Sequence, residues 1–137
     1  MAAVNFELRG YQRAALRALR SYLCKVVRMD GVADNPAKAA FSDVTEASYY
    51  PAPLVNEQTP YVCIRIPTGG GKTIVAAHTV GVAARDYLQA DNPMVLWLVP
   101  STAILDQTLA ALRDLDHPYR AALAADFGRN LTVLTVA

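Results

Sequence analysis

The chain has 137 residues, of which 53% are apolar and 18% are charged, and its formal net charge is +1. This composition excludes a disordered chain and predicts a globular one of about one domain. Its two cysteines, Cys24 and Cys63, exclude a disulfide framework and lack metal-ligand spacing, so we expect buried free thiols in a reducing cytoplasm. There is no signal-peptide pattern, and no apolar run approaches the roughly 18 residues that span a bilayer, so we predict no membrane partner.

Residues 1–28 form the first predicted region, an amphipathic helix at 9–28. Its apolar residues recur at three- and four-residue steps: Leu16, Leu19, Leu23 and Val26 or Val27. This region contains six Arg or Lys residues and a single Glu, and Arg13, Arg17 and Arg20 lie on another side of the predicted helix. This stripe is compatible with a solvated face and equally with a surface that attracts phosphate groups.

Residues 29–60 predict a loop or insertion, with a short helix near 36–41. Asp30-Gly31, Asn35-Pro36 and three further prolines interrupt the periodicity, and five acidic residues outnumber Lys38. An irregular segment of this length in a compact domain is expected to be functional or mobile.

Residues 61–137 predict strands alternating with helices. We expect strands at 61–66, 94–99 and 131–136, and helices at 73–89, 103–115 and 119–126. The continuous apolar run 94–99 is typical of a strand covered on both faces. This order predicts a three-layer α/β sandwich with a mainly parallel sheet and right-handed crossovers.

A glycine-rich run lies between the first expected strand and the next helix: Pro67-Thr68-Gly69-Gly70-Gly71-Lys72-Thr73. Three glycines let backbone amides turn inward without a Cβ clash, and the helix N-terminus adds unpaired amides and its dipole. Lys72 can bring a charge to the β- and γ-phosphates, and Thr73 can offer a hydroxyl to Mg²⁺. The run therefore predicts a nucleoside-triphosphate site with these two residues as catalytic candidates. The general pattern G-x-x-x-x-G-K-[ST] has Ile66 in place of its first glycine, so only the narrower form P-T-G-x-G-K-T is present.

Two further strings carry polar groups suited to the same chemistry. Gln12, in L-R-G-Y-Q, has a carboxamide that both donates and accepts, as the adenine edge requires. Ser101 and Thr102 begin a helix after a buried strand, where helix amides can hold a nucleic-acid phosphate. Taken alone, the Gln12 string is a weak signal that could be only a helix start, and the Ser101–Thr102 string favours an ordinary strand–cap–helix unit.

In order and spacing, the three strings resemble the start of the first RecA-like motor domain of superfamily 2 helicases and translocases. L-R-x-Y-Q resembles the adenine-reading Q motif, P-T-G-G-G-K-T resembles motif I, and W-L-V-P-S-x-x-I-x-x-Q-T resembles motif Ia. The strongest resemblance is to the restriction (Res) subunit of type III restriction enzymes, through R-I-P-T-G-G-G-K-T, motif Ia and D-H-P-Y-R. DEAD-box RNA helicases fit less well, because Ala103 and Ile104 stand where their motif Ia has an Arg-Glu pair.

This resemblance implies ATP and Mg²⁺ as cofactors, and double-stranded DNA, contacted through its backbone, as a partner. A modification (methyltransferase) subunit would read the target site. Carried over by position, the phosphates and Mg²⁺ would be held by Gly69, Gly70, Gly71, Lys72 and Thr73. Adenine would be read by Gln12 with Arg9, and the DNA backbone would be contacted by Ser101 and Thr102.

Such motors also need an Asp-Glu pair near Mg²⁺ and an arginine finger from a second domain. No Asp-Glu or Glu-Asp dipeptide occurs in the sequence, and the six aspartates after the glycine run are isolated. We therefore expect residues 61–137 to be an incomplete RecA-like ATP-binding domain. The chain would be an N-terminal fragment of an ATP-dependent DNA translocase and endonuclease, inactive by itself. The alternatives are a stand-alone nucleotide-binding module, another superfamily 2 DNA helicase, or a P-loop kinase, which would need a lid with paired arginines.

Overall fold

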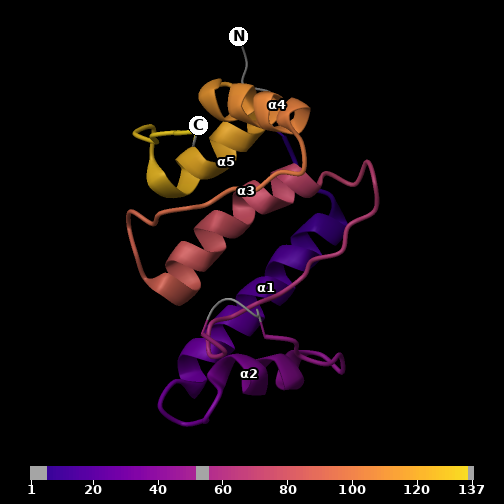
Figure 1. The fold of residues 1–137 in the computed structure, drawn as a ribbon, viewed down its shortest axis with the longest axis vertical. Coiled ribbons are helices and arrows are strands. Elements are labelled where there is room, and N and C mark those ends of the chain that lie inside the picture. The colour runs from indigo at the N-terminus through magenta and orange to yellow at the C-terminus, as the bar shows by residue number, and fades with distance from the viewer. Residues whose placement is uncertain (1–5, 52–55, 136–137) are drawn as a thin grey trace.

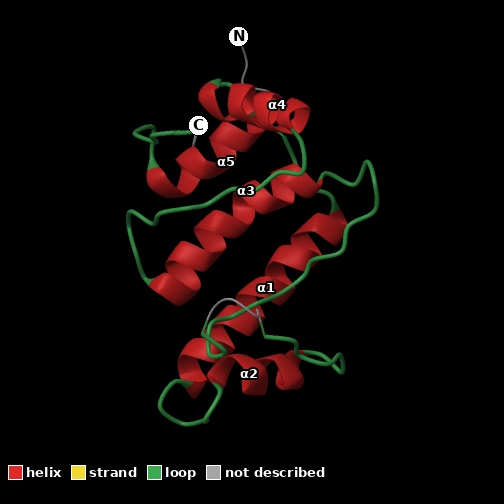
Figure 2. Cartoon of the chain, in the orientation of Figure 1, coloured by secondary structure: helices red, strands yellow, loops and turns green. Residues whose placement is uncertain are grey.

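The computed structural model describes residues 6–51 and 56–135, and all regular structure in these ranges is helical (Figures 1 and 2). The elements in chain order are α1 (Gly10–Met29), α2 (Pro36–Val44), α3 (Lys72–Ala83), η1 (Ala84–Leu88), α4 (Thr102–Arg113) and α5 (Pro118–Phe127). The element η1 is a turn of π-helix that continues α3. Helices α1 and α3 lie side by side, α2 packs on α1, α5 packs on α3, and α4 packs on α5 (Figure 1).

The first apolar cluster joins α1, α2 and α3. Leu19, Tyr22, Leu23 and Val26 of α1 are buried against Ala40 and Val82. Helix α2 starts where Asn35 accepts a hydrogen bond from the Lys38 amide at 2.9 Å, with Pro36 at its first position. The predicted helices at 9–28 and near 36–41 are thus confirmed, to within three residues at their ends.

A second, smaller cluster joins α3 to α5. Ile74, Ala77 and Ala122 are buried here, and Trp97 and Tyr119 pack against them. The predicted helices at 103–115 and 119–126 are confirmed as α4 and α5, and the helix at 73–89 is confirmed as α3 with η1. The two clusters together fix the position of α3, whose first residue is Lys72.

The prediction of a three-layer α/β sandwich with a parallel sheet is wrong for the described residues. Segments 61–66, 94–99 and 131–135 are neither helical nor paired with a strand, and residue 136 lies outside the described ranges (Figure 2). Residues 61–66 still alternate in exposure as an extended chain does, and Val62 and Ile64 pack on the first cluster. Apolar periodicity specifies which side chains leave water, but a strand also needs a partner for its backbone, and here helices provide the apolar surface instead.

The expectation that residues 94–99 are covered on both faces is also wrong. Met94, Leu96 and Leu98 are 99%, 75% and 80% exposed, and in this run only Trp97 and Val99 are half-buried. We also expected both cysteines to be buried, but Cys63 is exposed and Cys24 is half-buried. No helix among the described residues is long and apolar enough to cross a membrane.

Candidate nucleotide-binding site

The glycine run forms the turn that leads into α3, and each of its glycines has a physical reason. Gly69 and Gly71 have φ of 76° and 77°, in the left-handed region where a Cβ is strained. Gly70 is buried, and a Cβ on it would lie 2.5 Å from Ile66 Cγ2 and 2.8 Å from the Pro67 carbonyl oxygen. The three consecutive glycines are therefore required by this backbone, as the sequence pattern predicted.

Lys72 and Thr73 occupy the first two positions of α3, with Gly71 as the N-cap. The first helical hydrogen bond runs from the Val75 amide to the Gly71 carbonyl at 3.2 Å, so the amides of the first turn have no partner within the helix. Lys72 is exposed and Thr73 is half-buried. Unpaired amides, the positive end of the helix dipole, an ammonium group and a hydroxyl thus meet at one helix terminus, which is the donor set that a phosphate chain requires.

Gln12 lies directly against this loop, although 58 residues separate it from Gly70. Its Nε2 donates to the Gly70 carbonyl at 2.9 Å, and its Oε1 accepts from the Arg9 amide at 2.8 Å. Tyr11 Oη donates to the same Gly70 carbonyl at 2.8 Å. The structure therefore brings the L-R-G-Y-Q string and the glycine run together. It also engages both polar atoms of Gln12 within the protein, where that side chain is only 3% exposed.

Ser101 and Thr102 are both exposed at the start of α4. Ser101 is the N-cap and its Oγ accepts from the Ile104 amide at 3.4 Å. The pair thus lies at a helix N-terminus, as the sequence predicted, and the structure leaves it open to solvent. Arg9, the other proposed adenine contact, is exposed at the N-cap of α1.

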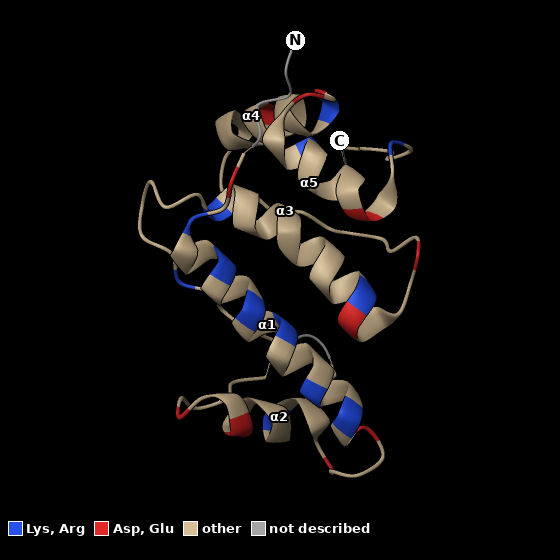
Figure 3. Cartoon of the chain, turned by 180° about the vertical axis from the view of Figure 1, so that it is seen from behind, with Lys and Arg blue, Asp and Glu red and all other residues tan. Residues whose placement is uncertain are grey.

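Basic residues recur along the length of α1 (Figure 3). At 100° per residue, its exposed arginines fall within an arc of about 80° that is distinct from the buried side: Arg13, Arg17, Arg20 and Arg28. This face, which we call the α1 arginine face, extends over about 22 Å at 1.5 Å per residue.

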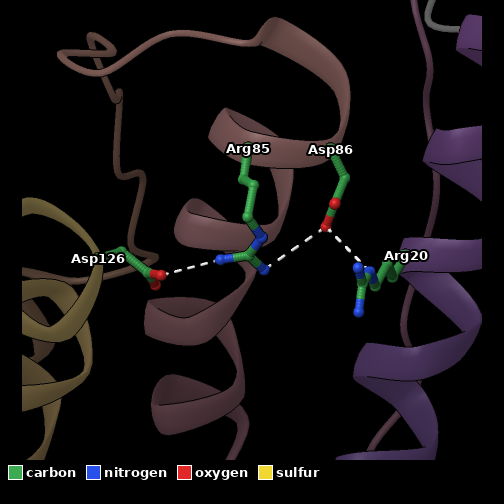
Figure 4. A network of polar contacts seen from close by, with 4 residues as sticks. All are labelled: Arg20, Arg85, Asp86 and Asp126. Carbon is green, nitrogen blue, oxygen red and sulfur yellow. Dashed lines mark hydrogen bonds and ion pairs between the residues drawn. The ribbon is translucent and has the colours of Figure 1, made fainter.

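A four-residue ionic network, not predicted from the sequence, ties α1, η1 and α5 together (Figure 4). Asp86 Oδ2 lies 3.4 Å from Arg20 Nε and 3.5 Å from Arg85 Nη2, and Arg85 Nη1 lies 2.9 Å from Asp126 Oδ1. Asp126 also lies against Gly81, where a Cβ would come within 1.8 Å of Oδ2. The adjacency of Arg85 and Asp86 in the sequence was the only available signal, and it does not reveal the partners on other helices.

A hollow of about 610 Å³ adjoins this network and is lined by Gly81, Ala84, Arg85, Gln89, Ala90, Asp91, Asn92, Asp126 and Phe127. None of these residues belongs to the glycine run. On α3, burial lowers the pKa of His78, and the negative charge of Asp126, which lines this hollow, opposes part of that effect.

Arg120 is a charged residue of α5 that is buried, with 6% exposure. Its guanidinium donates to the carbonyls of Leu112, Arg129 and Leu131 at 2.8 to 3.3 Å. It therefore joins α4, α5 and the segment that follows, which is a structural role that a sequence gives no means of assigning.

Within residues 6–51 and 56–135, no group of three or more His, Cys, Asp or Glu side chains could hold a metal ion. The glycine run carries two side-chain oxygens, the Thr68 and Thr73 hydroxyls, and Thr73 is the one within the first turn of α3. This fits Mg²⁺ at a phosphate site, because that ion takes most of its ligands from water and the phosphates themselves.

Comparison with known families gives a match over most of the chain. A family described as Type III restriction enzyme, res subunit, matches residues 5–132. The chain belongs to this family. Neither the search of curated proteins nor that of solved structures finds a match. The resemblance seen in the three sequence strings is thereby confirmed, and the res-subunit family is associated with ATP-dependent restriction enzymes and helicase-related NTPases.

Proposed function

We propose that this chain is the ATP-binding part of a DNA-dependent ATPase and translocase of the type III restriction class. The observation that carries the proposal is the loop 69–73, with two glycines at positive φ and unpaired amides at the start of α3. Family membership supports a nucleoside triphosphate as the ligand. Residues 61–137 would supply the phosphate site and residues 1–28 the base contacts.

Each residue of the site has a separate task in this proposal. Loop amides and Lys72 stabilise negative charge on the phosphates, and Thr73 would hold Mg²⁺, which would neutralise the β- and γ-oxygens. Arg9 and Gln12 would contact adenine. Because both polar atoms of Gln12 are already engaged once, the groups left for the base are its second N–H and its remaining oxygen lone pairs.

Double-stranded DNA is the proposed macromolecular partner, contacted through its phosphates. Ser101 and Thr102 at the exposed start of α4 would fix the position of the backbone. The α1 arginine face would add a contact that is independent of sequence and sensitive to salt. Reading of a target site would then belong to a modification subunit.

Hydrolysis requires groups beyond those of this site. The sequence contains no Asp-Glu dipeptide, so the proposal assigns binding of ATP, and not its turnover, to these 137 residues. Robust ATP turnover by this chain that disappears in Lys72→Ala would contradict the assignment.

A direct test measures ATP binding to the wild-type chain and to Lys72→Ala. Loss of one or two charge-assisted hydrogen bonds predicts an affinity about 10- to 10⁴-fold lower. Lys38→Ala is the matched control, because Lys38 is also an exposed lysine in the first turn of a helix, on α2. Equal affinity of wild type and Lys72→Ala would refute the phosphate site.

A stand-alone nucleotide-binding module is the second candidate, favoured by the missing Asp-Glu pair. The two candidates differ in their response to DNA. A motor component binds DNA with a salt-dependent affinity that involves Ser101 and the α1 arginine face, whereas a simple nucleotide-binding module gives no such dependence.

A further inference from the structure

The carbonyl group of Gly70 accepts two hydrogen bonds from consecutive residues of α1. Tyr11 Oη lies 2.8 Å away and Gln12 Nε2 lies 2.9 Å away. The two donors come from the first turn of α1, and the acceptor lies in the middle of the glycine run. A single backbone oxygen is thus the point at which α1 holds the loop.

The orientation of this peptide decides what the loop offers to a ligand. No described peptide bond is cis, so the Gly70 carbonyl and the Gly71 amide point in opposite directions. With the oxygen held against α1, the Gly71 N–H lies on the opposite side of the loop. If the peptide flipped, an oxygen would take the place of that N–H, and an oxygen repels phosphate.

Side-chain sterics do little to prevent such a flip, because the peptide lies between two glycines and glycine populates positive and negative φ almost equally. The two donors on the Gly70 oxygen therefore set the orientation. Gln12 is committed to this position by its burial and by its bond to the Arg9 amide. Tyr11 is 42% exposed, so its hydroxyl contributes to the loop more than to the core.

We propose that Tyr11 is a positioning residue for phosphate binding, which acts by holding the Gly70–Gly71 peptide with its N–H free for the ligand. This inference rests on the proposed function. Tyr11 touches no phosphate itself, and its effect is independent of the base. It therefore changes the affinity for any Mg²⁺-bound triphosphate chain.

The test is calorimetric titration of the 137-residue chain with two probes, Mg-ATP and Mg-tripolyphosphate. Tyr11→Phe keeps the ring and removes only the donor. Loss of one neutral hydrogen bond predicts an affinity about 2- to 10-fold lower, by the same factor for both probes. The ligand-free melting temperature serves as the structural readout and is expected to stay close to that of the wild type.

The matched control is Tyr49→Phe. Tyr49 Oη donates to the Thr59 carbonyl at 3.1 Å, so this variant loses the same kind of bond away from the glycine run. Both probes are expected to bind it as they bind the wild type. An equal loss of affinity in Tyr49→Phe would overturn the inference, because the effect of Tyr11→Phe would then be nonspecific.

Two other results would overturn it and leave the proposed function in place. In the first, Tyr11→Phe binds both probes like the wild type while Lys72→Ala loses them. In the second, Tyr11→Phe weakens ATP but not tripolyphosphate, which would place Tyr11 at the base. If Lys72→Ala binds tripolyphosphate as tightly as the wild type, the phosphate site itself fails and the inference fails with it.

Discussion

Replacing Gly71 by alanine tests how tightly the glycine loop is coupled to α1. Gly71 has a φ of 77°, and a Cβ on it would lie 2.5 Å from Gln12 Nε2 and 3.1 Å from Ile74 Cγ2. Placing alanine in the left-handed region costs about 1–2 kcal/mol. Displacing Gln12 weakens its bond to Gly70 and costs about 0.5–1.5 kcal/mol more. We therefore expect Gly71→Ala to lower the free energy of unfolding by about 2–3 kcal/mol.

Two other glycines separate the two costs. Gly69 has a φ of 76° and Gly31 a φ of 72°, and a Cβ on either would meet nothing within 4 Å. Gly69→Ala and Gly31→Ala therefore report the backbone strain alone, about 1–2 kcal/mol each. The difference between Gly71→Ala and Gly69→Ala, about 1 kcal/mol, measures the contact with Gln12.

The assay is urea denaturation of the three variants, followed by titration with Mg-ATP. Nucleotide affinity is expected to fall in Gly71→Ala and Gly69→Ala, which change the loop, and to stay unchanged in Gly31→Ala. The reasoning is refuted if Gly71→Ala and Gly69→Ala lose the same stability, or if Gly31→Ala weakens ATP binding as strongly as the loop variants do.

Three further predictions concern burial and charge. Arg120→Met removes the guanidinium that donates to three carbonyls, so we expect a loss of about 2–4 kcal/mol in the free energy of unfolding measured by urea denaturation. The exposed control Arg113→Met is expected to lose less than about 0.5 kcal/mol. Because the folded pKa of His78 is lowered, the unfolded chain binds this proton more readily. The free energy of unfolding therefore includes a contribution from neutral His78 that is present above about pH 6.5 and is lost as the pH falls through the folded pKa. His78→Gln should remove this part of the pH dependence, which is measured by denaturation at about pH 7.5 and 5.5. In DNA titrations at several salt concentrations, Arg17→Ala should lower the affinity and reduce the steepness of log K against log salt by about 0.9, whereas the control Arg113→Ala should change neither. Equal slopes for the wild type, Arg17→Ala and Arg113→Ala would show that the α1 arginine face does not contact DNA.

The helices were predictable because their information is local. The three- and four-residue repeat of leucines in α1, the Asn35-Pro36 start of α2 and the Ser101 cap of α4 each fix a helix from neighbouring residues. The glycine run was predictable for the same reason. Positive φ at Gly69 and Gly71 is a property of the local backbone that only glycine adopts readily.

The strands were not predictable in this way, because their information is not local. The run Met94–Val99 has the apolarity of a buried strand, yet a strand exists only where another backbone supplies its hydrogen bonds. In this structure the apolar surface available to Val62, Ile64 and Trp97 belongs to helices. The α/β prediction failed because a sequence pattern describes a preference for burial and does not name the partner.

The sequence by itself determined the family and the position of the glycine run at the start of α3, and from that run it predicted a phosphate site. Only the tertiary structure decided that Tyr11 and Gln12 meet at the Gly70 carbonyl, that Asp86 joins two arginines from different elements, and that Arg120 lies buried among carbonyls. The physical reason is the range of each interaction. Backbone conformation and capping depend on a few adjacent residues, whereas the partners of a buried donor or charge depend on how distant segments pack.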